Sequence, residues 1–190
     1  MMIFTLLELF DAVLMSVVIG FIFKDIFQAK KISPEGIPIE ERFSLKPMLM
    51  AMAVTVPAIA LHELAHKLTA VGYGLQATFS ASYLGLGIGL ALKLIGSPFI
   101  FFIPAYVSIV GDVSPLANAM ISLAGPITNL LLWLISKIIL AKAKKLSKEM
   151  KIILLVTRKI NGFLFILNML PIPGFDGFSA YASIIQLIFT

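Results

Sequence analysis

The sequence consists of long apolar runs separated by short polar stretches. The first run covers residues 1–23, and a polar loop that contains prolines and glycine follows it up to residue 46. The second run, residues 47–71, stops at Gly72-Tyr73-Gly74, where two glycines suit the C-terminus of a helix. A helix needs about 20 apolar residues to cross a bilayer. We therefore expect both runs to be membrane-spanning helices.

The middle of the chain is less regular. Residues 76–83 mix Thr, Phe, Ser and Tyr, which favours a short strand or hairpin. Residues 84–110 are apolar but contain four glycines and two prolines. Neither half of this segment is a clean span of about 20 residues. We expect a re-entrant hairpin or two short helices there.

The last third contains one further long helix and one broken apolar block. Residues 116–140 are predicted to be helical, and a lysine-rich linker follows at residues 137–151. Within the block of residues 152–190, two prolines and two glycines interrupt residues 168–177. A break at membrane depth is tolerated only where the backbone lines a cavity or packs on protein. The break is therefore a candidate part of a functional site.

Composition supports a membrane protein. Hydrophobic residues make up 59% of the 190-residue chain and charged residues 13%, against about 25% charged residues in soluble domains. We expect a single-domain (residues 1–190), all-α, multi-pass integral protein of the cell membrane. It would have about five or six transmembrane or re-entrant helices, with a short β segment after the second span. The net charge of +5 comes from loops between apolar runs, so it describes topology in a lipid bilayer and predicts no nucleic-acid partner.

The candidate chemistry begins with the only two histidines, His62 and His66, which lie near the end of the second run. Residues four apart share one face of a helix, so both imidazoles can bind one zinc ion, and Glu63 can reach the water that this zinc activates. The histidines could instead form hydrogen bonds between helices. Three polar groups in one lipid-buried turn are costly and usually functional, which favours zinc binding.

A catalytic zinc site needs a third protein ligand besides an open position for water. The chain has no cysteine, so this ligand should be a carboxylate. Among Glu8, Asp11, Asp112 and Asp176, only Asp176 lies in a helix break with small neighbours. An aspartate before a glycine is also a common turn residue, but beside two histidine ligands we favour Asp176 as the third ligand of one zinc per chain. Asp11 is expected to face the helix bundle or the membrane interface.

Three motifs, in this order, resemble those of the site-2 protease family of intramembrane zinc metalloproteases. They are His62-Glu63-Leu64-Ala65-His66, Gly125-Pro126 with Asn129, and Asn168-Met169-Leu170-Pro171-Ile172-Pro173-Gly174-Phe175-Asp176-Gly177. The resemblance covers residues 47–177, which we take as the catalytic core. It implies zinc ligation by His62, His66 and Asp176, general acid/base catalysis by Glu63, and a place for Asn129 and Asn168 near the substrate or the site.

The resemblance implies a membrane-embedded zinc metalloendopeptidase that acts in regulated intramembrane proteolysis. Its substrate would be a transmembrane protein or peptide that unwinds locally, held by strand addition to residues 76–83. Residues 84–110 and 170–177 would form the walls of a water channel. The alternative is a polytopic metal transporter or metal-binding channel, which has no need of a carboxylate beside the first histidine. Glu63 therefore favours the protease.

The basic residues and the family resemblance imply opposite orientations in the membrane. At about 1.5 Å per helical residue, Lys46 lies roughly 24 Å from His62, and Lys142 lies roughly 20 Å from Asn129. The basic residues therefore mark the membrane face opposite the site, and the positive-inside rule would make this face cytoplasmic. The family resemblance implies instead that the site lies nearer the cytoplasm. The sequence leaves the orientation, the oligomeric state and the identity of the substrate open.

Overall fold

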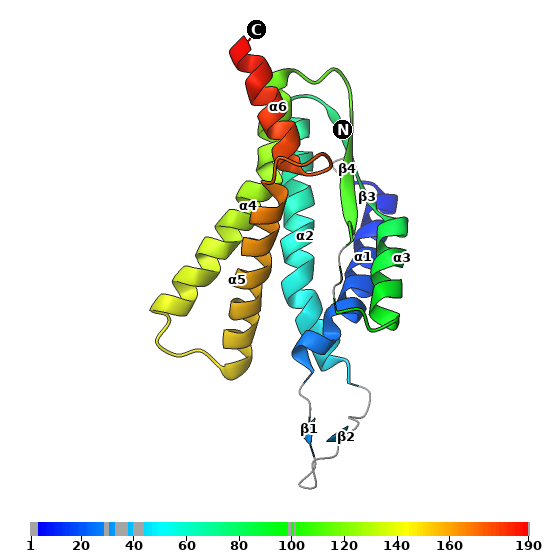
Figure 1. The fold of residues 1–190 in the computed structure, drawn as a ribbon, viewed down its shortest axis with the longest axis vertical. Coiled ribbons are helices and arrows are strands. Elements are labelled where there is room, and N and C mark those ends of the chain that lie inside the picture. The colour runs from blue at the N-terminus through cyan, green and yellow to red at the C-terminus, as the bar shows by residue number, and fades with distance from the viewer. Residues whose placement is uncertain are drawn as a thin grey trace.

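The computed structural model describes residues 4–28, 31–32, 38–39, 44–98, 100 and 102–189, and this part of the chain is mainly helical (Figure 1). It contains six α-helices, one 3-10 helix and two antiparallel sheets of two strands each. In chain order the elements are α1 (Leu6–Phe23), η1 (Lys24–Phe27), β1 (Lys31–Ile32), β2 (Pro38–Ile39), α2 (Lys46–Gly72), β3 (Gln76–Ala81), α3 (Tyr83–Leu94), β4 (Ala105–Val110), α4 (Pro115–Lys142), α5 (Lys148–Asn168) and α6 (Asp176–Phe189).

Three helical segments in the described residues are long and apolar enough to cross a membrane: Leu6–Phe27, Lys46–Gly72 and Pro115–Lys142. They correspond to the three long helices that the apolar runs predict. The helices α3 and α6 have 12 and 14 residues, which is short for a complete crossing. Helix α5 has 21 residues but contains several lysines and an arginine. The structure thus indicates a membrane protein, while the count of five or six transmembrane or re-entrant helices stays a prediction.

The sheet formed by β3 and β4 differs from the structure that the sequence predicts for residues 84–110. A strand does form within residues 76–83, but it pairs with β4 along its whole length, from Gln76 opposite Val110 to Ala81 opposite Ala105. In the described part of residues 84–110 the structure has one short helix, α3, and the strand β4, so the second of the two expected short helices is replaced by a strand. The re-entrant hairpin stays a prediction. The sequence Ala-Tyr-Val-Ser-Ile-Val of β4 is rich in β-branched and aromatic residues, which pack well on a pleated surface.

The lysine-rich linker is also shorter than predicted. Helix α4 continues to Lys142 and α5 begins at Lys148, so the connection covers only residues 143–147. Lysine is a good helix former, and the Ser147 side chain accepts a hydrogen bond from the backbone N–H of Met150 as an N-cap. The two helices therefore extend into the basic region.

Helix α2 lies in the middle of the molecule, with α1 and α3 on one side and α4 and α5 on the other (Figure 1). One buried apolar cluster joins α1 to the β3–β4 sheet and α3; it contains Met15, Ile19, Phe79, Ala81, Leu86 and Ala105. Helix α4 contacts α2, α5 and α6. This packing places the start of α6 beside the second half of α2, where the two histidines lie.

Candidate metal centre

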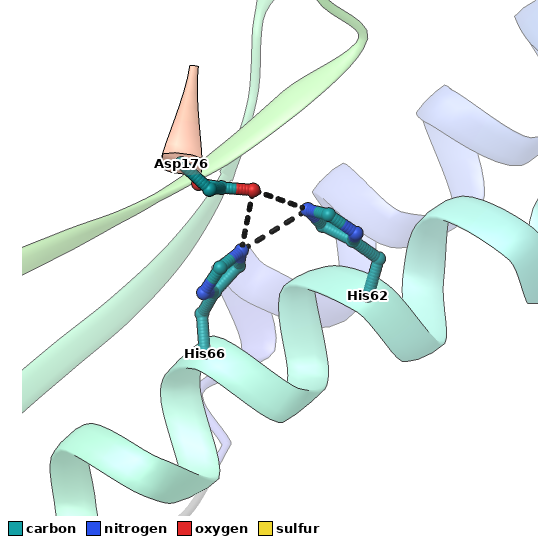
Figure 2. A group of neighbouring side chains, drawn as sticks. All are labelled: His62, His66 and Asp176. Carbon is teal, nitrogen blue, oxygen red and sulfur yellow. Dashed lines mark hydrogen bonds and ion pairs between the residues drawn. The ribbon is translucent and has the colours of Figure 1, made fainter. Parts of the chain in front are cut away.

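Three polar side chains from the helices α2 and α6 point toward one another (Figure 2). His62 and His66 lie on one face of α2, and their Nε2 atoms are 3.0 Å apart. Asp176 is the first residue of α6, and its Oδ2 lies 3.1 Å from Nε2 of His62 and 3.4 Å from Nε2 of His66. Both histidines are buried. The fold thus brings the three residues together as a group that could hold a metal ion.

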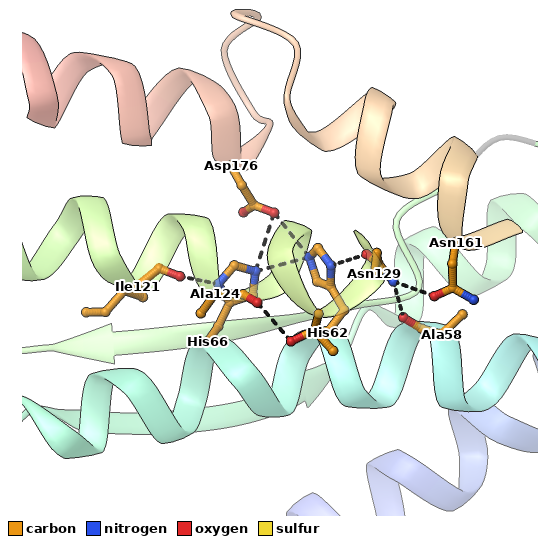
Figure 3. A network of polar contacts seen from close by, with 9 residues as sticks. Ala58, His62, His66, Ile121, Ala124, Asn129, Asn161 and Asp176 are labelled. Carbon is orange, nitrogen blue, oxygen red and sulfur yellow. Dashed lines mark hydrogen bonds and ion pairs between the residues drawn. The ribbon is translucent and has the colours of Figure 1, made fainter. Parts of the chain in front are cut away.

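The other ring nitrogens show which way each imidazole is protonated (Figure 3). Nδ1 of His66 lies 2.7 Å from the backbone carbonyl of Ile121, which can only accept a hydrogen bond. Nδ1 of His62 lies 2.6 Å from Oδ1 of Asn129. Both Nδ1 atoms therefore donate, and in a neutral imidazole the lone pair is then on Nε2. The two lone pairs are directed to the same point as the Asp176 carboxylate.

The orientation of Asn129 is fixed by a chain of buried amides. Its Nδ2 donates to the carbonyl of Ala58 and to Oδ1 of Asn161, each at 2.9 Å. Asn161 in turn donates from Nδ2 to the carbonyl of Thr157, also at 2.9 Å. Backbone carbonyls at both ends can only accept, so neither amide can be reversed. The oxygen of Asn129 must therefore face His62.

The three converging atoms fit a zinc ion. Two lone pairs and a carboxylate oxygen repel one another unless a cation lies between them, and the nitrogen and oxygen donors are those typical of zinc. Tetrahedral ligands at about 2.05 Å from a common ion lie about 3.3 Å apart. The separations of 3.0, 3.1 and 3.4 Å are close to this value.

Gly125 of α4 lets the two imidazoles lie against that helix. A Cβ atom at this position would overlap Nε2 of His66 and would lie 2.6 Å from Nε2 of His62. Real Cβ atoms essentially never come this close to another heavy atom. The glycine of the Gly125-Pro126 motif therefore has a steric role at the metal centre.

We expect Gly125→Ala to weaken zinc binding at least tenfold, because the added methyl group displaces both donor nitrogens, and disturbing the support of metal ligands costs about 10–100-fold in affinity. Competition with a chromophoric chelator measures this affinity. Gly87→Ala in α3 is the matched control, since a Cβ there meets nothing within 4 Å. Equal affinities for the two variants would contradict the steric role of Gly125.

The interruption between the helices α5 and α6 determines the position of Asp176. A Cβ on Gly177 would lie 2.7 Å from the carbonyl carbon of Met169, so only glycine allows α6 to start directly against the end of α5. The Tyr181 hydroxyl donates to the Met169 carbonyl at 3.0 Å and ties the same two helices together. The break predicted over residues 168–177 is thus the structural reason why this carboxylate reaches α2.

A cavity of about 480 Å³ opens beside the metal centre, and its lining is mostly apolar. Glu63 lines it next to the histidines and is not one of the three converging groups. Residues 100, 102–107 and 109 line the cavity and so do residues 174–176, as predicted for the channel walls, but in the described part of the chain α3 does not. Within the predicted segment 84–110, the described residues that line the cavity therefore lie in its second half.

The remaining candidates differ in how directly they reach the site. Asn129 contacts His62, whereas Asn168 lines the cavity and, among the described residues, takes no part in the amide chain. Asn161 and the Ile121 carbonyl were not predicted. The sequence contains no clear signal for Asn161, which closely follows Arg158 and Lys159 in a polar part of α5. No side-chain pattern can identify a backbone carbonyl as a histidine partner.

Comparison with known proteins gives one informative relative. The chain is 37% identical over 137 residues to a protein of Methanocaldococcus jannaschii named "putative zinc metalloprotease", and the match covers 71% of this chain and 70% of that protein. No protein-family model matches the chain. No solved structure matches it either.

Proposed function

The chain belongs to a family of zinc metalloproteases, and from this premise we propose that it hydrolyses peptide bonds within or near transmembrane helices of membrane-protein substrates. The observation that carries the proposal is the position of the metal centre. Its three residues line a mostly apolar cavity, and two of them lie on a helix long enough to span a membrane. The motifs that resemble those of site-2 proteases support the same activity, in a multi-pass protein of the cell membrane.

In this proposal His62, His66 and Asp176 hold one zinc ion per chain. When bound, zinc supplies a Lewis acid that polarises a peptide carbonyl and activates water. Asn129 and the Ile121 carbonyl keep the two imidazoles in the tautomer whose Nε2 atoms bind a metal. Their contribution is to keep the donor atoms in position before any ion arrives.

Glu63 is the proposed general base and acid. Its side chain lines the cavity one residue after His62, on the helix that also carries His66. A carboxylate in this position can take a proton from water and return it to the leaving amine. Glu63 is half-buried, and among the described residues its carboxylate makes neither a hydrogen bond nor an ion pair, so it is available for proton transfer.

Strand β4 offers a binding edge for an unwound substrate. The Ser82 amide donates to the Pro104 carbonyl, and in an antiparallel ladder the backbone groups of alternate residues face the same neighbour. Ala105, Val107 and Ile109 therefore direct their N–H and C=O groups away from β3. All three residues line the cavity, whereas no β3 residue does. We propose strand addition to β4 in place of the segment 76–83 expected from the sequence.

A cleavage assay on the purified protein in detergent tests the proposed function. We expect hydrolysis of a synthetic transmembrane peptide to fall to background on addition of a zinc chelator and to return when zinc is restored, because the Lewis acid is indispensable for water attack. A peptide that stays helical because it lacks glycine and proline serves as the substrate control. Absence of cleavage together with zinc flux across proteoliposomes would favour the transporter instead.

A further inference from the structure

The outer edge of the β3–β4 sheet is closed by two buried carboxylates of α1. The Phe79 N–H donates to Oε1 of Glu8 at 2.7 Å, and the Ala81 N–H donates to Oδ2 of Asp11 at 3.0 Å. Both acidic residues are 3% exposed. Asp11 thus faces the bundle, one of the two positions that the sequence predicts for it, and accepts a hydrogen bond from a strand edge there.

Each carboxylate is held by further contacts. Glu8 accepts a hydrogen bond from the Thr5 N–H at 2.8 Å and forms a buried ion pair with Lys67, the residue after His66. Asp11 accepts a hydrogen bond at 2.5 Å from the hydroxyl of Tyr83, the first residue of α3. The two side chains therefore connect β3 to the metal-binding helix α2 and to α3.

The two edges of the β3–β4 sheet differ in whether their backbone groups are already hydrogen-bonded. An unpaired strand edge is a template for pairing with another chain. On β3 the N–H groups of alternate residues are already bound by α1, while the equivalent groups of β4 face the cavity beside the metal centre. An extended peptide consequently cannot pair with the Phe79 and Ala81 N–H groups of β3, whereas the outward backbone groups of β4 face the cavity.

We propose that Glu8 and Asp11 are positioning residues for the substrate: they close one edge of the sheet and hold the sheet so that the peptide adds to β4, beside His62 and Asp176. The proposal rests on the proposed function, since it concerns how that substrate is bound. Helix α1 would thus help to place the substrate although its carboxylates do not contact the metal.

Asp11 is the better residue for the test, because removing Glu8 would leave the buried Lys67 without its partner. Asp11→Ala deletes the acceptor, whereas Asp11→Asn keeps an oxygen that can accept the Ala81 N–H. Tyr83→Phe is the matched control, since it removes only the hydroxyl contact and leaves the strand edge covered. The double variant Glu8→Leu with Lys67→Leu removes the other carboxylate without an unpaired charge.

Hydrogen exchange in a Glu63→Gln background tests the placement without requiring hydrolysis. A transmembrane peptide should slow exchange at the Val107 and Ile109 amides at least tenfold. In Asp11→Ala this protection should fall severalfold and new protection should arise at Ala81, while Asp11→Asn and Tyr83→Phe should behave as the parent. In the hydrolysis assay Asp11→Ala should raise KM about tenfold, with kcat within twofold and zinc content unchanged.

Three outcomes would overturn the proposal. Unchanged protection and KM in both Asp11→Ala and the double variant would mean that the closed edge does not guide the substrate. Loss of zinc in Asp11→Ala would mean a role in building the metal centre. Cleavage by the parent protein without any protection of β4 would exclude strand addition but not the proposed protease activity. If the proposed protease activity itself is wrong, the parent protein will not cleave the peptide.

Discussion

Replacing Glu63 by glutamine is expected to leave zinc bound and to lower kcat/KM for peptide hydrolysis by between about a hundredfold and ten thousandfold, the usual contribution of general acid–base catalysis. Glutamine has nearly the same shape but cannot take a proton from water. Because Glu63 is not one of the three converging groups, the metal centre should remain. The measurements are kcat/KM with a transmembrane peptide and the zinc content of the same preparation.

Glu149→Gln is the matched control for this variant. Glu149 is an exposed glutamate of α5, and its carboxylate pairs with Lys46 at 3.6 Å, at the start of α2 and far along that helix from the histidines. It should hydrolyse the peptide at the unmodified rate. Native hydrolysis by Glu63→Gln would remove this residue from the chemistry, and another group would then have to take the proton from water.

Replacing Asp176 by alanine is expected to weaken zinc binding by more than about a hundredfold, because even the outer partners of metal ligands contribute 10–100-fold. The two histidines would then be the only remaining donors of the group. His62→Ala and His66→Ala should have effects of the same size. Chelator competition measures the affinities, and hydrolysis should disappear in all three variants at limiting zinc.

Asp112→Ala is the control for a general effect of losing an aspartate, since Asp112 lies exposed in the turn before α4. Its zinc affinity should equal that of the unmodified chain. Full zinc retention by Asp176→Ala would make Asp176 an ordinary turn residue before Gly177. The carboxylate would then be a neighbour of the histidines without being a ligand.

Short-range patterns determined much of the fold. The long apolar runs predicted the helical segments that became α1, α2 and α4, since bilayer thickness alone sets the length they need. The spacing of His62 and His66 placed both on one face, because this depends only on helix periodicity. The break before Asp176 was visible as a cluster of prolines and glycines.

Contacts between distant segments were decided by the tertiary structure. The strand β4 was not predicted, because its pairing with β3 is a long-range contact and its six residues are too short to distinguish from an apolar helix by pattern alone. The same is true of Asn161 and the Ile121 carbonyl, whose roles depend on where α5 and α4 pack against α2.

The sequence by itself therefore determined the helical segments that are long and apolar enough to span a membrane and which residue types could bind zinc. Only the tertiary structure decided that Oδ2 of Asp176 lies 3.1 Å from Nε2 of His62, that Gly125 leaves room for both imidazoles, and that α1 closes one edge of the sheet. The physical reason is that helix periodicity and hydrophobicity act between near neighbours in the chain. The direction of a lone pair and the choice of a free strand edge depend on packing between segments that the sequence separates widely.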